Sequence, residues 1–171
     1  TLNSTGYGFI GGNASGKGIV NISTDSLWNL KTSSTNAQLL QVGVLGTGEL
    51  NITTGGIVKA RDTQIALNDK SKGDVRVDGQ NSLLETFNMY VGTSGTGTLT
   101  LTNSGTLNVE GGEVYLGVFE PAVGTLNIGA AHGEAAADAG FITNATKVEF
   151  GSGEGVFVFN HTNNSDAGYQ V

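Results

Sequence analysis

Several residue types on which common functions depend are missing or scarce in this sequence. Among the 171 residues there is no cysteine, one proline and two histidines, and only 13% are charged. The absence of cysteine excludes a disulfide scaffold, a zinc-thiolate site and a thiol nucleophile. No apolar run approaches the length of a transmembrane helix. The net charge of −7 argues against a nucleic-acid-binding protein, which normally carries a basic surface.

Glycine, in contrast, is abundant, with 28 residues. Much of it belongs to a recurring unit of two alternating apolar residues, a glycine, a glycine-rich turn and two more alternating apolar residues. Copies of this unit begin at Ile10, Val42, Leu67, Val91, Leu116 and Phe150. The copies recur with a period of about 25 residues, and insertions near residues 31–38 and 130–140 lengthen two of the intervals.

Aligning the copies places apolar residues in columns that lie two positions apart. The two columns after the turn contain Val20, Leu50, Val75, Leu99, Leu126 and Phe157, and Ile22, Ile52, Val77, Leu101, Ile128 and Phe159. The column before the turn contains Gly8, Leu40, Ile65, Met89, Val114 and Val148. A third, less regular strand presents Trp28, Val58, Leu83 and Leu107. A spacing of two indicates strands with one buried face.

The repeats predict an all-β fold, a parallel β-solenoid of about six rungs. Each rung has roughly 25 residues and three short strands, and residues 1–171 form a single segment. Glycine and asparagine supply the sharp corners between strands. The alternation continues through the last copy without a cap, so we expect the segment to be part of a longer solenoid.

Some of these residues also carry a family resemblance. The segments GTGELNI, GTGTLTL and VGTLNIG, followed by GAAHGEAAADAG and FVFNHTNN, resemble passenger domains of bacterial autotransporters, which use type V secretion. More narrowly, they are similar to the passenger-associated repeats of AIDA-like adhesins, most clearly over residues 90–162.

The resemblance implies a right-handed β-helix that crosses the outer membrane and is displayed at the bacterial cell surface or released outside the cell. The absence of cysteine fits such export, because a periplasmic disulfide would obstruct an extended chain. Contact with a membrane would then be made only by a C-terminal barrel that this chain lacks.

Few residues suggest chemistry. Polysaccharide-cleaving enzymes need clustered carboxylates, and the alignment shows no evident carboxylate pair on adjacent rungs. Asp69 and Asp74 flank one turn, where solvated charges are the simpler interpretation. His132, Glu134 and Asp138 lie together in the 130–140 insertion, but three scattered ligands are a weak signal for a metal. We therefore predict no catalytic, cofactor-binding or metal-binding residue.

The outer surface offers one candidate binding patch. Phe9, Gln41, Ala66, Tyr90, Tyr115 and Glu149 occupy the outward column next to the inward one. Tyr90 and Tyr115 fall on successive rungs, so we expect their rings to stack on the exterior. Such a pair either binds a sugar ring or a partner surface, or forms a stabilising aromatic ladder.

From these observations we expect a cell-surface adhesin segment that supports cell adhesion, autoaggregation or biofilm formation through multivalent polar contacts. Its expected partners are passengers on other cells, host extracellular-matrix proteins or glycans, with no nucleic acid and no cofactor. An adhesin of this kind is not an enzyme. The alternative is a β-helix enzyme acting on polysaccharides, either a lyase or a hydrolase.

Overall fold

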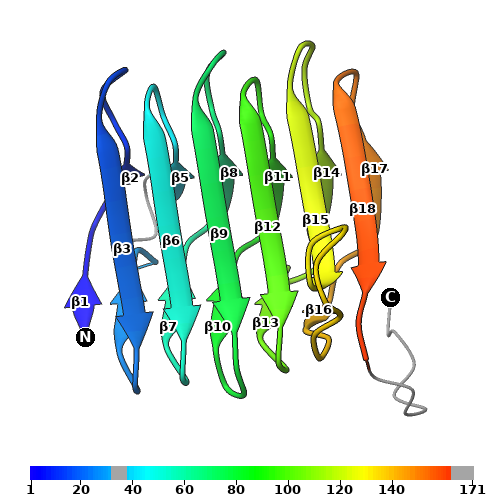
Figure 1. The fold of residues 1–171 in the computed structure, drawn as a ribbon. Coiled ribbons are helices and arrows are strands. Elements are labelled where there is room, and N and C mark those ends of the chain that lie inside the picture. Colours follow the sequence, from blue (N-terminus) through cyan, green and yellow to red (C-terminus); the bar gives the residue numbers. More distant parts are fainter. Residues whose placement is uncertain (32–37, 163–171) are drawn as a thin grey trace.

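The computed structural model describes residues 1–31 and 38–162, and within them the chain consists of strands, turns and bends without a helix. The strands form three six-stranded sheets in which every strand pairs with its neighbours in parallel (Figure 1). Within the described residues, no helix has the length and apolar character needed to cross a membrane. The all-β, parallel β-solenoid fold predicted from the repeats is therefore confirmed.

The chain visits the three sheets in turn. Sheet A contains β1 (Leu2–Asn3), β4 (Leu27–Asn29), β7 (Ile57–Lys59), β10 (Leu83–Glu85), β13 (Thr106–Asn108) and β16 (Phe141–Thr143). Sheet B contains β2 (Gly8–Ile10), β5 (Leu39–Val42), β8 (Asp62–Ile65), β11 (Asn88–Val91), β14 (Glu113–Leu116) and β17 (Lys147–Phe150). Sheet C contains β3 (Lys17–Ser23), β6 (Thr47–Thr53), β9 (Lys72–Asp78), β12 (Thr96–Thr102), β15 (Val123–Gly129) and β18 (Glu154–Asn160).

The number of turns is smaller than expected. The repeat count predicted about six rungs, whereas the coil makes about five complete turns. Six equivalent strands in each sheet are separated by only five intervals, and β1 is a two-residue strand. The predicted insertion near 31–38 lies almost entirely outside the described residues, whereas the one at 130–140 forms the connection between β15 and β16.

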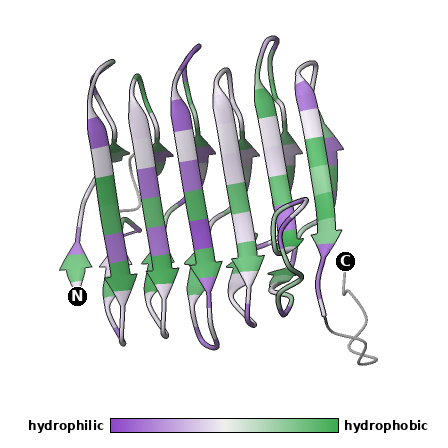
Figure 2. Cartoon of the chain, in the orientation of Figure 1, coloured by the Kyte–Doolittle hydropathy of each residue, from purple (hydrophilic) through white to green (hydrophobic). Residues whose placement is uncertain are grey.

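The interior is built from the predicted columns of sheet C. The register pairs Leu50 with Val75 and Leu99 with Leu126, and these side chains are fully buried. Figure 2 shows the consequence as alternating hydrophilic and hydrophobic bands along the strands of sheet C. Because each turn contributes only a few apolar side chains, its core is completed by the turns on either side.

Two predicted register positions are wrong. In sheet B the register places Ile65, not Leu67, beside Val42 and Val91, and Thr63 takes the inward position two residues earlier. The cause is Ala66, whose φ of 56° makes the corner that glycine makes in neighbouring turns, so this turn begins two residues early. The hydroxyl groups of the buried Thr63 and Thr86 are hydrogen-bonded at 3.2 Å.

The second correction concerns two consecutive leucines in β10. Leu84, not Leu83, pairs with Val58 and Leu107 and is fully buried. Alternation allows either leucine of the pair to face inward, so the sequence alone did not decide between them. The register with the flanking strands β7 and β13 decides it.

A column of glycines runs through the start of sheet C. The second residue of each strand is glycine, and the six are register partners: Gly18, Gly48, Gly73, Gly97, Gly124 and Gly155. A Cβ atom at Gly124 would lie 2.0 Å from the carbonyl oxygen of Val91. The corner between sheets B and C therefore packs directly on this column, which explains six of the 28 glycines.

Candidate functional site

A concave surface lies on the outer face of sheet C. It is an open groove of about 500 Å³. Its floor is formed by outward side chains of three adjacent strands: Glu49 and Asn51 of β6, Asp74 and Arg76 of β9, and Thr100 and Thr102 of β12. Strand alternation directs these residues outward because their neighbours Leu50, Val75 and Leu101 fill the core.

The 130–140 insertion forms one wall of the groove. Gly129, with a φ of 88°, ends β15 and lets the chain leave the sheet. The insertion then lies over the end of sheet C (Figure 1) and lines the groove with Ala130, Ala131, Glu134 and Ala137. It is fixed in place by an antiparallel bridge between Thr102 and Ala139, and by hydrogen bonds of 2.9 Å from the amide of Asn160 to the carbonyls of Ala131 and Glu134.

A second hollow of about 330 Å³ continues the groove toward the beginning of the sheet C strands. It shares Glu49 and Asp74 with the groove and adds Lys17 and Lys72 to the lining. The ammonium group of Lys17 lies 3.8 Å from the carboxylate of Glu49. The two carboxylates therefore occupy the junction of a concave band that runs along three strands.

Glu49 and Asp74 form a carboxylate pair on adjacent strands. They are register partners in β6 and β9 and face the same side of the sheet. The expectation that adjacent rungs hold no carboxylate pair is therefore wrong. The alignment already contained the signal, because both residues stand one position before the inward column of Leu50 and Val75.

The electrostatics of Asp74 differ from those of an isolated surface carboxylate. Partial loss of hydration within the groove and the nearby charge of Glu49 raise the pKa of Asp74, while the positive charge of Arg76 opposes this shift. Asp74 remains in contact with solvent, so the shift reports a crowded groove floor rather than a deeply buried acid.

Asp78, at the end of the same strand, shows the opposite behaviour. Burial alone would raise its pKa, but hydrogen bonds from Thr102 and Asn103, together with the guanidinium of Arg76, outweigh burial and lower the pKa. The two hydrogen bonds are 2.7 Å long, and Arg76 Nη2 lies 3.3 Å from Asp78 Oδ1. Asp78 therefore anchors Arg76 and the turn after β12.

The lowered pKa gives a pH-dependent prediction. Because the folded-state pKa of Asp78 lies below its unfolded value, its ionised form stabilises the fold above the unfolded pKa, and this stabilisation is lost as pH falls through the folded pKa. Asp78→Asn is expected to lower the free energy of unfolding by about 1–2 kcal/mol at neutral pH. Urea denaturation should show this difference shrinking below about pH 4. A difference that does not change with pH would contradict the assignment.

The predicted stacking of Tyr90 and Tyr115 on the exterior of sheet B is confirmed. Their ring centroids are 5.0 Å apart and the ring planes differ by 5°. The hydroxyl of Tyr115 donates to Glu113, and the ammonium of Lys147 lies 6.0 Å from the centroid of the Tyr115 ring. Each ring therefore covers one face of the other, and Lys147 lies near the pair. This arrangement favours a stabilising aromatic ladder over a binding patch. Binding of a sugar ring or a partner surface by Tyr90 and Tyr115 remains a prediction.

The outward column that contains these tyrosines differs from the alignment at one position. Gln64, not Ala66, stands beside Tyr90 and Gln41, because the early corner at Ala66 shifts this turn. The amide of Gln41 donates to the amide oxygen of Gln64 at 2.6 Å. The exterior of sheet B therefore carries a glutamine pair followed by a tyrosine pair.

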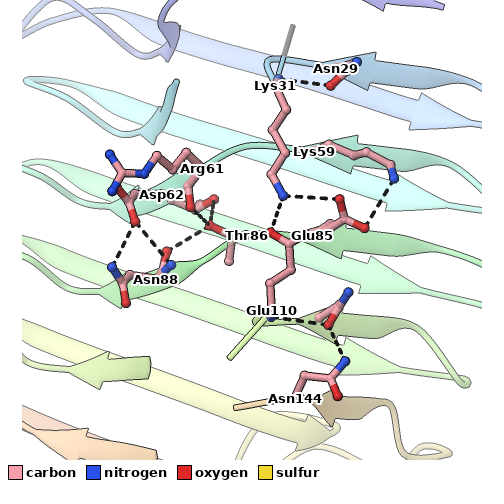
Figure 3. A network of polar contacts seen from close by, with 12 residues as sticks. Asn29, Lys31, Lys59, Arg61, Asp62, Glu85, Thr86, Asn88, Glu110 and Asn144 are labelled. Carbon is pink, nitrogen blue, oxygen red and sulfur yellow. Dashed lines mark hydrogen bonds and ion pairs between the residues drawn. The ribbon is translucent and has the colours of Figure 1, made fainter. Parts of the chain in front are cut away.

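The outer side of sheet A carries a charged network that was not predicted from the sequence. Lys31 binds Glu110 and lies 3.3 Å from Glu85, which in turn lies 3.3 Å from Lys59 (Figure 3). These residues come from four successive turns, and Lys59 and Glu85 are register partners. The signal for this network in the sequence was the presence of opposite charges at equivalent positions of successive rungs, as at Lys59 and Glu85. The network ties these turns together.

The metal candidates of the insertion do not come together around one point. Glu134 lines the groove, whereas Asp138 accepts a hydrogen bond from Thr162. In the described ranges, no group of three or more His, Cys, Asp or Glu side chains is arranged to hold a metal ion.

The fold and the groove together define a parallel β-solenoid with a polar concave band on one face. One similar protein is the "Uncharacterized lipoprotein YdeK" of Escherichia coli (strain K12), which is 99% identical over 150 residues. The match covers 88% of this chain but only 11% of that relative's length. No protein-family model matches the chain, and no solved structure gives a significant match.

These findings overturn the expectation drawn from the family resemblance. The relative is named a lipoprotein and not an autotransporter passenger, and no model of an adhesin family matches. The interpretation as an AIDA-like passenger exported by type V secretion was wrong, and with it the predicted role as an adhesin in adhesion, autoaggregation or biofilm formation. The repeat that carried the resemblance follows from the glycine column and the alternating core of the solenoid itself.

Proposed function

We propose that the chain is a non-catalytic rod segment of a cell-envelope lipoprotein, which sets the distance between the parts of a longer protein. The observation that carries this proposal is the unbroken register of six parallel strands in each of three sheets. Such a stack is stiff along its axis because every turn bonds to both neighbours. The winding is proposed to be right-handed, as parallel crossovers nearly always are.

The lipoprotein name of the relative supports a location of this segment at the cell envelope. A lipid anchor holds a protein at a membrane, so a stiff rod would project its distal parts away from that membrane. We further propose that the rod is exposed at the cell surface. The support for this location is a chain without cysteine and with a net charge of −7, which suits solubility in an oxidising environment outside the cytoplasm.

The absence of catalysis is part of this proposal, and the Glu49–Asp74 pair provides the test. Two neighbouring carboxylates with one raised pKa are also the arrangement that glycoside-cleaving enzymes use. Glu49, however, is paired with Lys17, and Asp74 lies beside Arg76, which suits binding and solvation.

Incubation of the chain with neutral, uronate-containing and amino polysaccharides is expected to release no reducing ends and no unsaturated products. Reducing-end and ultraviolet absorbance assays measure the two outcomes. Turnover that disappears in Glu49→Gln or Asp74→Asn would contradict the non-catalytic role, whereas turnover that persists in both variants would reveal a contaminant.

A further inference from the structure

Most of the exposed large apolar side chains among the described residues gather at the two ends of the coil. Of ten such residues, seven belong to its first or last turn: Leu2, Tyr7, Phe9, Ile19, Phe141, Phe150 and Phe159. The inward columns of sheet C show the same difference. Leu50 and Leu126 in inner strands are fully buried, whereas Val20 in β3 and Phe157 in β18 are only partly buried. Each end of the coil therefore leaves apolar surface in contact with solvent.

The backbone at both ends also lacks a partner strand within the described residues. β3 and β18 stand at opposite edges of sheet C, at the two ends of the stack (Figure 1). An edge strand presents a row of unpaired N–H and C=O groups that can pair with another chain. The two edges match in length, because β3 and β18 each contain seven residues.

The register shows which charged residues a second copy would bring together at this edge. Lys17 begins a column of register partners that ends at Glu154. One further turn in the same register sets Lys17 of a second copy beside Glu154 of the first. Both residues are exposed, and Lys17 keeps 62% of its side chain accessible although its ammonium group lies 3.8 Å from Glu49. The two ends therefore carry opposite charges at the positions that would meet.

The same operation matches apolar residues across the junction in all three sheets. It places Val20 beside Phe157 in sheet C, Ile10 beside Phe150 in sheet B and Leu2 beside Ile142 in sheet A. These side chains continue the apolar columns of the coil. Their burial at the junction removes apolar surface from water, which favours association.

The outward column that contains Ile19 distinguishes this junction from an arbitrary break in a longer coil. Its terminal members, Ile19 and Val156, are apolar, whereas its inner members are polar: Glu49, Asp74, Thr98 and Thr125. Ile19 is 50% exposed. A further turn of any sequence covers the inward columns, but it gives no reason for apolar residues on the outer face at both ends. In a head-to-tail stack, Ile19 and Val156 become neighbours and cover each other.

We propose that a second copy of the chain stacks head to tail on the first, with β3 of one copy pairing in parallel with β18 of the other. The contact joins two different surfaces and does not close on itself, so it produces linear oligomers rather than a closed dimer. Each added copy lengthens the rod in register. This inference goes beyond the proposed spacer role, which a single chain fulfils without it.

Sedimentation velocity of the full 171-residue chain, from micromolar to millimolar concentrations, tests the association. We expect the weight-average sedimentation coefficient to rise with concentration. Lys17→Glu and Glu154→Lys each place like charges across the junction, and each is expected to weaken association by at least about tenfold. An equimolar mixture of the two variants restores opposite charges at every junction between unlike chains. The mixture should therefore associate as the unmodified chain does.

Lys72→Glu is the matched control, because Lys72 belongs to the same column as Lys17 but lies in the inner strand β9. This variant should associate as the unmodified chain does, and circular dichroism verifies that each variant is folded. A chain that stays monomeric at every concentration would assign the ends to further turns of a longer coil and overturn the proposal. Association that Lys17→Glu leaves unchanged, that Lys72→Glu weakens equally, or that the mixture does not restore would also overturn it.

Discussion

Replacement of Gly124 by alanine is expected to destabilise the solenoid by more than about 3 kcal/mol. A Cβ atom at this position would lie 2.0 Å from the carbonyl oxygen of Val91 and 2.3 Å from the amide nitrogen of Gly117. These two atoms are hydrogen-bonded to each other at 2.9 Å. A single methyl group therefore enters a backbone hydrogen bond between two turns, and no flexible side chain is available to move aside.

Gly12→Ala is the matched control, because a Cβ atom there would meet nothing within 4 Å and the residue does not need a positive φ. Its effect on the free energy of unfolding should be small, or stabilising by up to about 1 kcal/mol. Urea denaturation followed by circular dichroism compares the two variants. Similar midpoints for Gly124→Ala and Gly12→Ala would show that the corner does not pack on the glycine column as described.

The second large effect is expected at the consecutive leucines of β10. Leu84 is fully buried between Val58 and Leu107, so Leu84→Ala should cost about 3–5 kcal/mol through lost burial and a remaining cavity. Leu83 faces outward and is partly exposed, so Leu83→Ala should cost about 1 kcal/mol or less.

The two leucine substitutions have the same chemistry and adjacent positions, so their difference reports the register alone. Urea denaturation under identical conditions gives both free energies of unfolding. A larger loss for Leu83→Ala would mean that the strand is shifted by one residue relative to β7 and β13, which exchanges the two faces.

The sequence predicted the fold well because the solenoid repeats its physical requirements in every turn. The two apolar columns of sheet C that begin at Val20 and Ile22 could be predicted from the spacing of two alone. The errors arose where one turn departs from the others. At Ala66 a non-glycine residue takes a positive φ, and a search for glycine corners therefore places this corner two residues late.

The groove was less predictable, for two different reasons. The Glu49–Asp74 pair could be recognised in the alignment, because both residues stand one position before the inward column of Leu50 and Val75. The wall of the groove could not be found in the alignment, because the 130–140 insertion contacts Thr102 and Asn160, which belong to two other strands. No local pattern specifies where a loop of this kind folds back.

The family interpretation failed for a related reason. The segments GTGELNI and GTGTLTL contain Gly48 and Gly97 of the glycine column, followed by the alternating core residues. Any parallel solenoid with a tight corner on this column requires such a pattern. The pattern therefore predicts the architecture, and it does not distinguish a secreted adhesin from a lipoprotein that uses the same coil.

The rod itself is the central claim, and a distance measurement across the stack tests it most directly. Asn21 and Val158 stand at the two ends of one register column, five turns apart. Because the chain has no cysteine, Asn21→Cys and Val158→Cys can be spin-labelled selectively. Pulsed electron paramagnetic resonance should give a narrow distribution of distances centred at about 24 Å between the labelled positions.

Duplicating residues 77–100 after Thr100 adds one turn in register. The account predicts that the same distance then increases by about 5 Å while the distribution stays narrow. An unchanged distance, or a broad distribution in either protein, would contradict a rod whose length is set by its number of turns.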